Sequence, residues 1–391
     1  MTRFLHTADW QLGKPFAGVA DAQKRALLIQ QRVAAVERLS GIAEDRGVAF
    51  VVVAGDVFDS AQPSRHTVAA GLSAIGQIKR PVYVIPGNHD HGGGGSLWED
   101  PHFLREASEL APNLQILVQR KPAIAPGAVL FPCPLLQRQE PQDPTTWLRT
   151  GPEGGDWDPK LPRVVLAHGS VQGFGINAFG DDEEAGGEGV NRIELDRIPA
   201  GEFDYIALGD WHGTKQVAAK AWYSGTPEID RFPKGGDHDP GNALLVSAER
   251  GQSPIVEKIP THEITWSDIE WEFIGDMGLG AFRERVADCV AQRVDRDLLR
   301  LRLRGALGLA QLAALEQCIE SWRSRLIRLR LDNSVAIVPS VAEMEALTQR
   351  HGDPLVARVA TRLSTLAQEP GESGQWARLA LRQLHQAVAA R

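Results

Sequence analysis

Aspartate, asparagine and histidine residues stand directly after short apolar runs in the first 212 residues. Carboxylate, amide and imidazole groups together are ligands for Mn²⁺, Fe and Zn²⁺, and one carboxylate can bridge two ions ~3.5–4 Å apart. Such ions hold the oxygens of an in-line displacement at phosphorus, so the set predicts a phosphoesterase. Its members are Asp9 after residues 3–5, Asp56 and Asp59 after residues 48–54, Asn88, His89 and Asp90 after residues 82–85, His168 after residues 163–167, and Asp210 and His212 after residues 205–208.

The apolar runs that precede these residues have the length of buried strands and are mostly bounded by glycine, proline or aspartate. Apolar residues at helical spacing in residues 21–46 and 64–78 predict two helices between strands. The alternation favours an α/β layered domain. Open α/β sheets place ligand sites at the carboxyl ends of their strands, so we expect one shared site.

Each residue of the set also has an ordinary structural interpretation. Asp9 and Asp56 are typical turn formers after a strand, and Asn88 tolerates a left-handed backbone. His168, before a glycine, is compatible with a hydrogen-bonded loop histidine. Because five strand ends carry this chemistry together, we favour the metal site.

The later part of the chain predicts further strands and a change of domain. Residues 222–224, 243–247 and 255–259 read as strands without intervening helices, and we expect them in a second sheet packed on the first. After Pro260, alternating arginine and leucine flank a helical pattern, which predicts a small strand–helix–strand domain with a basic sheet face. The predicted organisation is a domain at 1–260, a capping domain at 261–340 and a helical segment at 341–391, with an acidic surface loop at 180–189.

Composition limits the class of protein. The chain has 391 residues, 43% hydrophobic and 24% charged, with neither a signal peptide pattern nor an apolar run of about 18 residues, so we expect no membrane span and no export. Three widely spaced cysteines favour a reducing, cytoplasmic setting. The net charge of −8 excludes a global field that attracts nucleic acid, so phosphate binding needs a local basic face or metal ions.

The ordered motifs resemble those of the calcineurin-like metallophosphoesterase superfamily. More narrowly, HTADWQLG, AGDVFDSAQPS, IPGNHD and YSGTPEIDRF (residues 223–232) resemble motifs of the SbcD-type DNA double-strand-break repair nucleases. The resemblance covers residues 1–232 and implies a four-layer αββα metallophosphoesterase sandwich. The unit after residue 298 is similar to the family's small α/β capping domain.

The resemblance also implies residue roles at a centre of two divalent ions. It places one metal on Asp9, Asp56 and His212, and a second on Asp56, Asn88 and His168, with Asp56 bridging. His89 matches the family's non-ligand histidine, which stabilises or protonates the leaving oxygen. Asp59 and Asp90 match carboxylates that orient ligands.

Two positions depart from the family pattern. Asp-x-His becomes Asp9-Trp10-Gln11, and Gly-His-x-His becomes Gly209-Asp210-Trp211-His212. Asp210 still offers a metal ligand, whereas Gln11 offers only a weaker amide oxygen. One account is an active site that prefers Mn²⁺ over Zn²⁺, with Fe and Mg²⁺ as further alternatives; the other is an attenuated enzyme. We favour the active one because Asp56 and the remaining family residues are present.

Two kinds of residue are candidates for DNA contacts. Trp10 and Trp211 flank ligands and offer stacking surfaces, although core packing explains them equally well. Arg300, Arg302 and Arg304 offer guanidinium groups to phosphates, although arginine is also ordinary on the solvent face of a strand.

The function that we predict is a two-metal DNA phosphodiesterase of DNA repair, a 3′–5′ exonuclease with single-strand endonuclease activity. The resemblance implies a homodimer and an SMC-like coiled-coil ATPase of the SbcC type as partner, docked through helices after the cap. Residues 354–391, with two amphipathic segments broken at 369–371, either form that docking element or complete the cap. The alternatives are a phosphoesterase of small substrates and an attenuated DNA-binding regulatory subunit.

Overall fold

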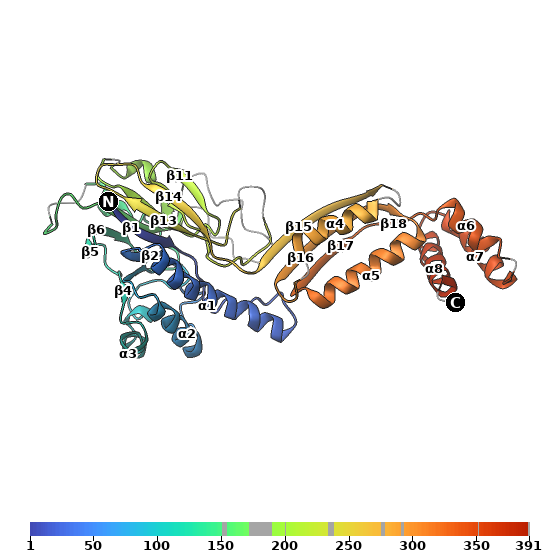
Figure 1. The fold of residues 1–391 in the computed structure, drawn as a ribbon, viewed down its shortest axis with the longest axis horizontal. Helices are drawn as coiled ribbons and strands as arrows, with labels where there is room; N and C mark the ends of the chain where they lie inside the picture. The colour runs from blue at the N-terminus through green and yellow to red at the C-terminus, as the bar shows by residue number, and fades with distance from the viewer. Residues whose placement is uncertain are drawn as a thin grey trace. The chain divides into compact units, whose positions relative to one another are not determined.

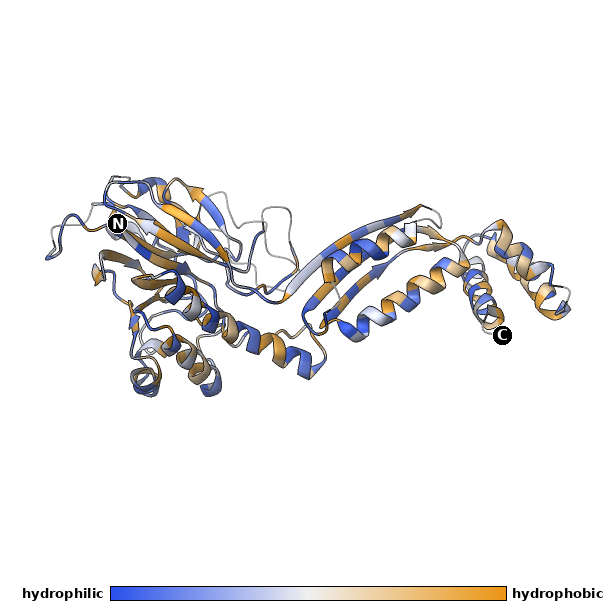
Figure 2. Ribbon diagram, in the orientation of Figure 1, coloured by the Kyte–Doolittle hydropathy of each residue, from blue (hydrophilic) through white to orange (hydrophobic). Residues whose placement is uncertain are grey.

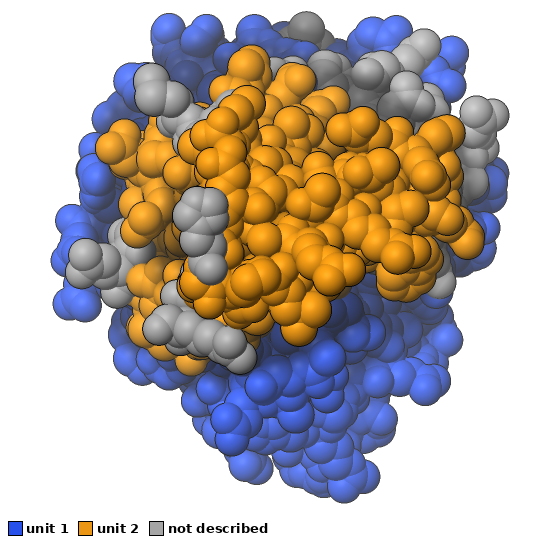
Figure 3. Space-filling view, turned by 90° about the vertical axis from the view of Figure 1, so that its right-hand side faces the viewer, with its two compact units in different colours: residues 1–264 blue, residues 265–391 orange. Residues whose placement is uncertain are grey.

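The computed structural model describes residues 1–150, 155–171, 190–199, 201–233, 238–274, 278–290, 293–350 and 352–389. The predicted acidic loop at 180–189 lies outside these residues. The chain divides into two compact units, Met1–Ile264 and Thr265–Arg391, which Figure 3 colours separately. The domain boundaries predicted at residues 260 and 340 stay predictions.

The first unit contains two six-stranded sheets (Figure 1). In the first sheet β1, β2, β3 and β4 run parallel, and β13 and β14 extend it antiparallel beyond β1. In the second, β12, β10, β7 and β6 run parallel, with antiparallel β11 and β5 at the edges. In spatial order the strands are β14 (Ile255–Pro260), β13 (Asn242–Ala248), β1 (Thr2–Thr7), β2 (Phe50–Ala54), β3 (Val82–Ile85) and β4 (Leu114–Ile116), then β11 (Lys215–Ala218), β12 (Ala221–Tyr223), β10 (Tyr205–Gly209), β7 (Arg163–His168), β6 (Ala128–Cys133) and β5 (Ala123–Ala125).

Sheet membership corrects one prediction. Residues 243–247 and 255–259 do form strands, but they join the first sheet, where β13 pairs with β1. The second sheet instead takes β6, β7 and β10 from the earlier part of the chain. An apolar pattern indicates that a strand is buried but does not indicate which strand it pairs with, because strand pairing depends on contacts between residues distant in sequence.

The layers follow from the faces that the sheets bury. Phe4 and Phe50 of the first sheet pack with Leu166 and Tyr205 of the second. Helices α1 (Ala22–Asp45), α2 (Arg65–Gln77) and α3 (Pro101–Leu110) cover the other face of the first sheet (Figure 1). Asp21, Ser64 and Asp100 cap these helices through their side-chain oxygens.

The outer face of the second sheet is covered by short helices and loops, in contrast to the three α-helices on the first sheet. Phe131 and Phe203 pack there near the short helices η2 (Thr146–Leu148) and η3 (Leu195–Arg197), and described residues of that region contain no α-helix. The strand pair β8 (Ser170–Val171) and β9 (Arg192–Ile193) lies in the same region of the chain, and η1 (Leu97–Glu99) precedes α3. The predicted α/β metallophosphoesterase class, with two packed sheets, is confirmed, and short 3₁₀ helices stand on the outer face of the second sheet in the described residues.

The second unit is an α/β unit followed by helices. β15, β16 and β17 form a parallel sheet, with β18 beside the end of β16, and the predicted strand–helix–strand unit is β16, α5 and β17. β15 and α4 complete it: Phe282 of α4 packs edge-to-face on Phe273 and Trp322. The elements are β15 (Thr265–Ile274), α4 (Gly278–Val290), β16 (Asp297–Leu307), α5 (Leu309–Arg325), β17 (Arg328–Asn333), β18 (Ala336–Ile337), α6 (Val341–Thr348), α7 (Pro354–Ala367) and α8 (Glu372–Ala389).

Hydropathy along the ribbon follows these layers. The central strands of both sheets are apolar, and helices such as α5 alternate apolar and polar faces (Figure 2). No helix in the described part of the chain is both long and apolar enough to cross a membrane.

His6 on β1 makes stability depend on pH. Its ring is buried, with Nδ1 2.9 Å from the Tyr205 hydroxyl and Nε2 3.2 Å from the Leu208 carbonyl oxygen, and burial lowers the pKa of His6 from 6.5 to about 3. Below pH 6.5 the unfolded chain therefore binds a proton that the folded chain refuses, and stability falls as the pH falls.

We expect acidification from pH 7 to 5.5 to cost the wild type about 1 kcal/mol more than His6→Gln, which lacks the titrating ring. Urea unfolding with a chelator present, followed by tryptophan fluorescence, measures the difference. Equal pH dependence of the two proteins would contradict the assignment.

Candidate metal centre

The predicted strand ends converge at one place. β1, β2 and β3 of the first sheet and β7 and β10 of the second bring their carboxyl-terminal loops together, and the metal-binding atoms of Asp9, Asp56 and His168 lie within 4.8 Å of one another. All three side chains are buried. Buried carboxylates beside an imidazole are expensive without a cation, so this group is where a divalent ion fits.

His168 at the end of β7 is oriented for coordination. Its Nδ1 lies 2.8 Å from the Ala54 carbonyl oxygen, which fixes Nε2 as the atom that faces the carboxylates. Around Nε2 lie Asn88 Oδ1 at 2.8 Å, Asp56 Oδ2 at 3.6 Å and Asp210 Oδ1 at 3.9 Å. Donor atoms of one octahedral ion with bonds near 2.1 Å are about 3 Å apart, so a small closure around a cation completes this site.

Asp210 supplies a carboxylate where the family motif has histidine. Its Oδ2 accepts a hydrogen bond from Ser170 Oγ at 2.8 Å, which leaves Oδ1 toward His168. Its backbone N–H lies 3.1 and 3.2 Å from the two carboxylate oxygens of Asp9. The substitution therefore keeps a ligand in the site and makes its donor set richer in hard oxygen.

The ligand loops have an unusual backbone. Asp9, Gln11, Asp56 and Asp210 all have positive φ, at 54°, 40°, 55° and 107°. Each such non-glycine residue costs about 1–3 kcal/mol, and the surrounding structure must hold it in place. Gln11 N donates to the Asp56 carbonyl oxygen at 2.9 Å, which ties the loop after β1 to the loop after β2.

Glycines allow the loops to approach one another. A Cβ on Gly55, where φ is +95°, would lie 2.2 Å from His168 Nδ1, and one on Gly87 would lie 2.1 Å from Asp56 Oδ1. Both distances are far shorter than a van der Waals contact, so any larger side chain would force the site residues to move. The glycines of the Gly-Asp and Gly-Asn-His motifs thus make room for the ligands that follow or face them.

The electrostatics of the centre show an excess of buried acid. Burial raises the pKa of Asp9 to about 8 and also raises that of Asp210. Burial opposes the charged ring of His168, yet the carboxylates of Asp56, Asp9 and Asp210 raise its pKa to about 9. Burial likewise opposes ionised Asp56, but His168 and His89 hold its pKa below the ordinary value. A divalent cation stabilises all the carboxylates in their charged form.

His89 stands at the edge of the centre. Its backbone N–H donates to Asp56 Oδ1 at 3.0 Å, and its Nδ1 lies 2.8 Å from the Asp59 carbonyl oxygen, so Nε2 points inward, 4.0 Å from Asp56 Oδ2. Burial lowers the pKa of His89, but Asp56 outweighs this effect and the pKa is raised. A partly exposed imidazolium at this place suits the donation of a proton to a leaving oxygen.

Asp59 and Asp90 support the centre in different ways. Asp90 accepts from Gly87 N at 2.8 Å and Phe58 N at 3.0 Å and so joins the loops after β2 and β3. Asp59 orients His89 through its carbonyl oxygen, whereas its carboxylate faces Lys14 at 3.9 Å. The contact of Asp59 with His89 is thus made by its backbone, and a ligand-orienting role of its carboxylate stays a prediction.

The other side of the centre holds the remaining predicted ligands. Gln11 Oε1 accepts a hydrogen bond from Lys14 Nζ at 2.9 Å. His212 Nδ1 lies 2.9 Å from Asp230 Oδ2, and Arg231 Nη2 lies 3.5 Å from His212 Nε2. Two side-chain cations thus stand against Gln11, which replaces a histidine of the family motif, and against His212, which the resemblance assigns to the first metal.

Sequence reasoning missed Lys14, Asp230 and Arg231 as site residues. Asp230 and Arg231 lie in the motif at residues 223–232, which was used only for its resemblance, and Lys14 comes three residues after Gln11. The charge of all three residues, and the place of Asp230 and Arg231 within a motif, could have indicated that they belong to the site.

The tryptophans next to the ligands differ. Trp10 is 1% exposed and its Nε1 donates to Thr7 Oγ1 at 2.9 Å, so the core-packing alternative describes it. Trp211 is half-buried and packs edge-to-face on His238, with ring centroids 6.0 Å apart. A DNA contact by Trp211 stays a prediction.

The basic strand of the second unit is already paired with acid. Parallel register sets Asp268 beside Arg300 and Glu270 beside Arg302. Arg300 and Arg302 both bond to Asp268, Arg302 Nε lies 2.6 Å from Glu270, and Arg304 lies 3.3 Å from the same carboxylate. Contacts of these arginines with DNA stay a prediction, and they would compete with the acidic strand.

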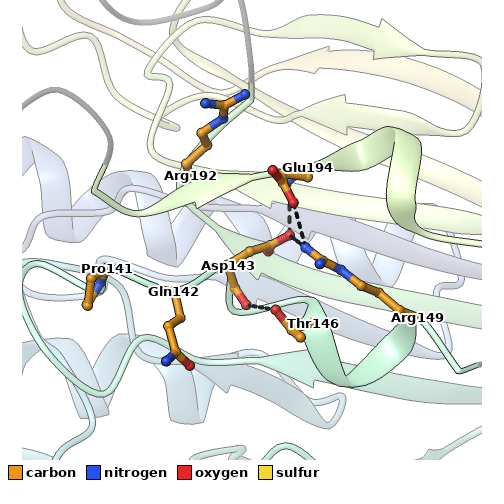
Figure 4. A pocket seen from close by; sticks show the side chains of 7 residues that line it. All are labelled: Pro141, Gln142, Asp143, Thr146, Arg149, Arg192 and Glu194. Atoms are coloured by element: carbon orange, nitrogen blue, oxygen red, sulfur yellow. Dashed lines mark hydrogen bonds and ion pairs between the residues drawn. The ribbon is translucent and has the colours of Figure 1, made fainter.

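A hollow of about 290 Å³ lies in another part of the first unit (Figure 4). Arg149 crosses it to Asp143 at 2.8 Å and Glu194 at 2.7 Å. None of the residues predicted for the site lines it. The lining residues are Pro141, Gln142, Asp143, Thr146, Arg149, Arg192 and Glu194.

Comparison with known proteins agrees with this geometry. Residues 2–239 match the family model described as calcineurin-like phosphoesterase. The chain belongs to this family. It is 26% identical over 298 residues to the SbcD component of the SbcCD nuclease of Bacillus subtilis (strain 168), covering 68% of this chain and 69% of that protein. As a family member, the chain is a metal-dependent phosphodiester hydrolase.

A solved structure was also matched. The crystal structure of TT1561 of Thermus thermophilus aligns with 66% of this chain and 99% of its own, at 14% identity and a TM-score of 0.38. A similarity at this level carries no argument about the fold.

The glycine contacts lead to a test of the metal centre. We expect Gly87→Ala to weaken Mn²⁺ binding at least about tenfold, because the added methyl group displaces the Asp56 carboxylate. Isothermal titration calorimetry on the full chain measures the affinity. Gly94→Ala is the matched control, since a Cβ there meets nothing within 4 Å. Unchanged affinity in Gly87→Ala would place the ion elsewhere.

Proposed function

We propose that the chain is a metal-dependent DNA phosphodiesterase of DNA repair, acting as a 3′–5′ exonuclease and a single-strand endonuclease. The observation that carries the proposal is the buried group Asp9, Asp56 and His168, with His89 at its edge, in a chain similar to a nuclease component. Mn²⁺ is the proposed ion because Asp210 adds a third carboxylate and Asn88 an amide oxygen to a single imidazole.

The residues of the centre divide the work of phosphodiester cleavage. A divalent ion bound there supplies charge for the phosphoryl oxygens and lowers the pKa of a coordinated water. Asp56 holds the loop of His89 through its backbone N–H. His89, whose pKa the Asp56 carboxylate raises, donates its proton to the leaving sugar oxygen. Asp90 keeps the loops after β2 and β3 in register during this step.

Two other functions use the same geometry. A phosphoesterase of small substrates needs the metal centre but no surface for nucleic acid, and the acid-paired arginines of β16 are compatible with it. An attenuated DNA-binding regulatory subunit would be consistent with Gln11, whose amide oxygen accepts a hydrogen bond from Lys14. The ligand set around His168 favours an active enzyme over an attenuated regulatory subunit.

The DNA reaction has a direct test. With Mn²⁺ we expect digestion of end-labelled linear and single-stranded DNA, with mononucleotides released from the 3′ end. Asp56→Ala should abolish it by removing a central ligand, and His89→Ala should slow it about 10²–10⁴-fold by removing the general acid. Electrophoresis of the labelled products measures both.

Exposed residues of the same types provide controls. Asp45→Ala and His66→Ala, on α1 and α2, should cleave like the parent. A folded, metal-bound parent that hydrolyses bis(p-nitrophenyl) phosphate but no DNA would replace the proposal with the small-substrate enzyme. A chain that binds DNA and no metal would favour the regulatory subunit.

We further propose that the terminal helices dock a coiled-coil ATPase of the SbcC type. α7 and α8 pack on each other and leave large apolar side chains in solvent: Leu355 is 72% exposed and Trp376 68%. Val359 lies one turn after Leu355, and Leu379 nearly one turn after Trp376, so each helix presents an apolar pair. Such pairs suit the apolar seam of a coiled coil.

Substitution of the apolar pair tests the docking. We expect Trp376→Ser to weaken binding of an SbcC-type ATPase at least about tenfold, because exposed aromatic anchors dominate such interfaces. DNA cleavage by the chain alone should not change. Leu104→Ser, at a 46% exposed position on α3, is the control for loss of a surface apolar group. Equal ATPase binding by both variants, measured by biolayer interferometry, would contradict the assignment.

Assembly and location complete the proposal. A homodimer is proposed from the resemblance, and its mass in light scattering would be twice 42.6 kDa. Cys133, Cys289 and Cys318 are all free thiols, which agrees with the proposed reducing cytoplasm.

A further inference from the structure

A cluster of charged side chains adjoins the metal centre on the side of Gln11 and His212. Lys14 Nζ lies 2.9 Å from Gln11 Oε1, 3.2 Å from Asp230 Oδ2 and 3.9 Å from Asp59 Oδ1. The Lys14 side chain is only 15% exposed, and Asp230 is fully buried. The ammonium is therefore held among site residues by three oxygen atoms.

The contacts of Lys14 connect it to the catalytic edge. Its charge lowers the pKa of Asp59 and of His89, and lowers that of His212 as well, in each case as one influence among several. Lys14 also contacts the two residues that hold these rings: Asp59, whose carbonyl oxygen lies 2.8 Å from His89 Nδ1, and Asp230, whose Oδ2 lies 2.9 Å from His212 Nδ1. Lysine is a compact point charge, and this suits it to a place where a phosphate oxygen arrives.

The same cluster does not fit a divalent ion at the first site. Gln11 directs its amide oxygen to Lys14, and an amide that accepts from an ammonium is a poor ligand for a neighbouring cation. His212 has Arg231 Nη2 at 2.7 Å from Nδ1 and 3.5 Å from Nε2. A metal on Nε2 would meet the positive guanidinium of Arg231 at short range.

Charge balance points the same way. The centre brings together three carboxylates, Asp9, Asp56 and Asp210, whereas the family motif has histidine at the last position. Beside it, the carboxylates of Asp59 and Asp230 already face two side-chain cations, Lys14 and Arg231, so this neighbouring cluster needs no divalent ion to balance its charge. Asp230 is meanwhile balanced by Arg231, whose Nε lies 3.1 Å from Oδ1.

We propose that the Lys14 ammonium takes the place of the first-site divalent ion, so that this chain holds one metal, on the side of Asn88, His168 and Asp210. Lys14 then binds the phosphate oxygen that a first-site ion would contact. The inference rests on the proposed phosphodiesterase function of this centre, and it changes the number of ions expected from the resemblance.

Metal counting tests the proposal without any substrate. The full-length chain is loaded with Mn²⁺, freed of excess ion and measured by plasma mass spectrometry and by electron paramagnetic resonance. We expect one ion per chain and the six-line signal of isolated Mn²⁺. Two ions per chain with the signal of a coupled pair would overturn the proposal, as would the absence of bound metal.

Restoring the family pattern gives the reverse experiment. The double variant Gln11→His/Lys14→Gln regains an imidazole ligand and loses the ammonium, so we expect it to bind a second ion and to show the coupled-pair signal. A folded double variant that still binds one ion would overturn the assignment of Lys14 as the substitute.

Hydrolysis of bis(p-nitrophenyl) phosphate tests the role of Lys14 toward phosphate and does not depend on DNA as substrate. We expect Lys14→Gln to lower kcat about 100-fold with one ion still bound, and Lys14→Arg to recover part of the loss. Lys160→Gln, at an exposed position, controls for the lost positive charge and should match the parent. Unchanged kcat in Lys14→Gln would overturn the proposal, whereas failure on DNA alone would bear only on the proposed function.

Discussion

The burial of several carboxylates where two sheets meet is the constraint on which this molecule depends. Asp9, Asp56 and Asp210 lie within reach of one imidazole, and burial pushes the pKa of Asp9 to about 8. Such a group is stable in its charged form only with positive charge beside it. The chain provides for this with a metal-binding geometry and with lysine and arginine from nearby loops.

The backbone is shaped by the same requirement. Four site residues adopt positive φ, and two glycines leave space that a single methyl group would fill. Arg32 of α1 fixes the loop after β1. Its buried guanidinium donates hydrogen bonds to the Asp9 carbonyl oxygen at 2.9 Å and to the Trp10 carbonyl oxygen at 2.7 Å. The helix layer thus fixes the ligands through backbone oxygens and leaves their side chains to the site.

In the second unit, the charge of one face of β16 depends on the neighbouring strand β15. The alternation of arginine and leucine in β16 predicts a basic face, and the leucines are indeed buried. Register with β15 sets Asp268 and Glu270 against those arginines, so the face carries ion pairs in place of uncompensated charge. Neither strand by itself contains this information.

The α/β class, the early strands and the helices α1, α2 and α5 could be predicted from the sequence alone, because burial and helical periodicity are local properties. It also predicted that side chains at several strand ends gather at one place, and Asp56, Asn88 and His168 do lie close together. The three-dimensional structure was needed to show that β13 joins β1, that the Asp59 carbonyl oxygen contacts His89, and that Lys14 and Arg231 face Gln11 and His212. These features arise from contacts between segments distant in sequence or from side-chain orientation, and a one-dimensional pattern specifies neither.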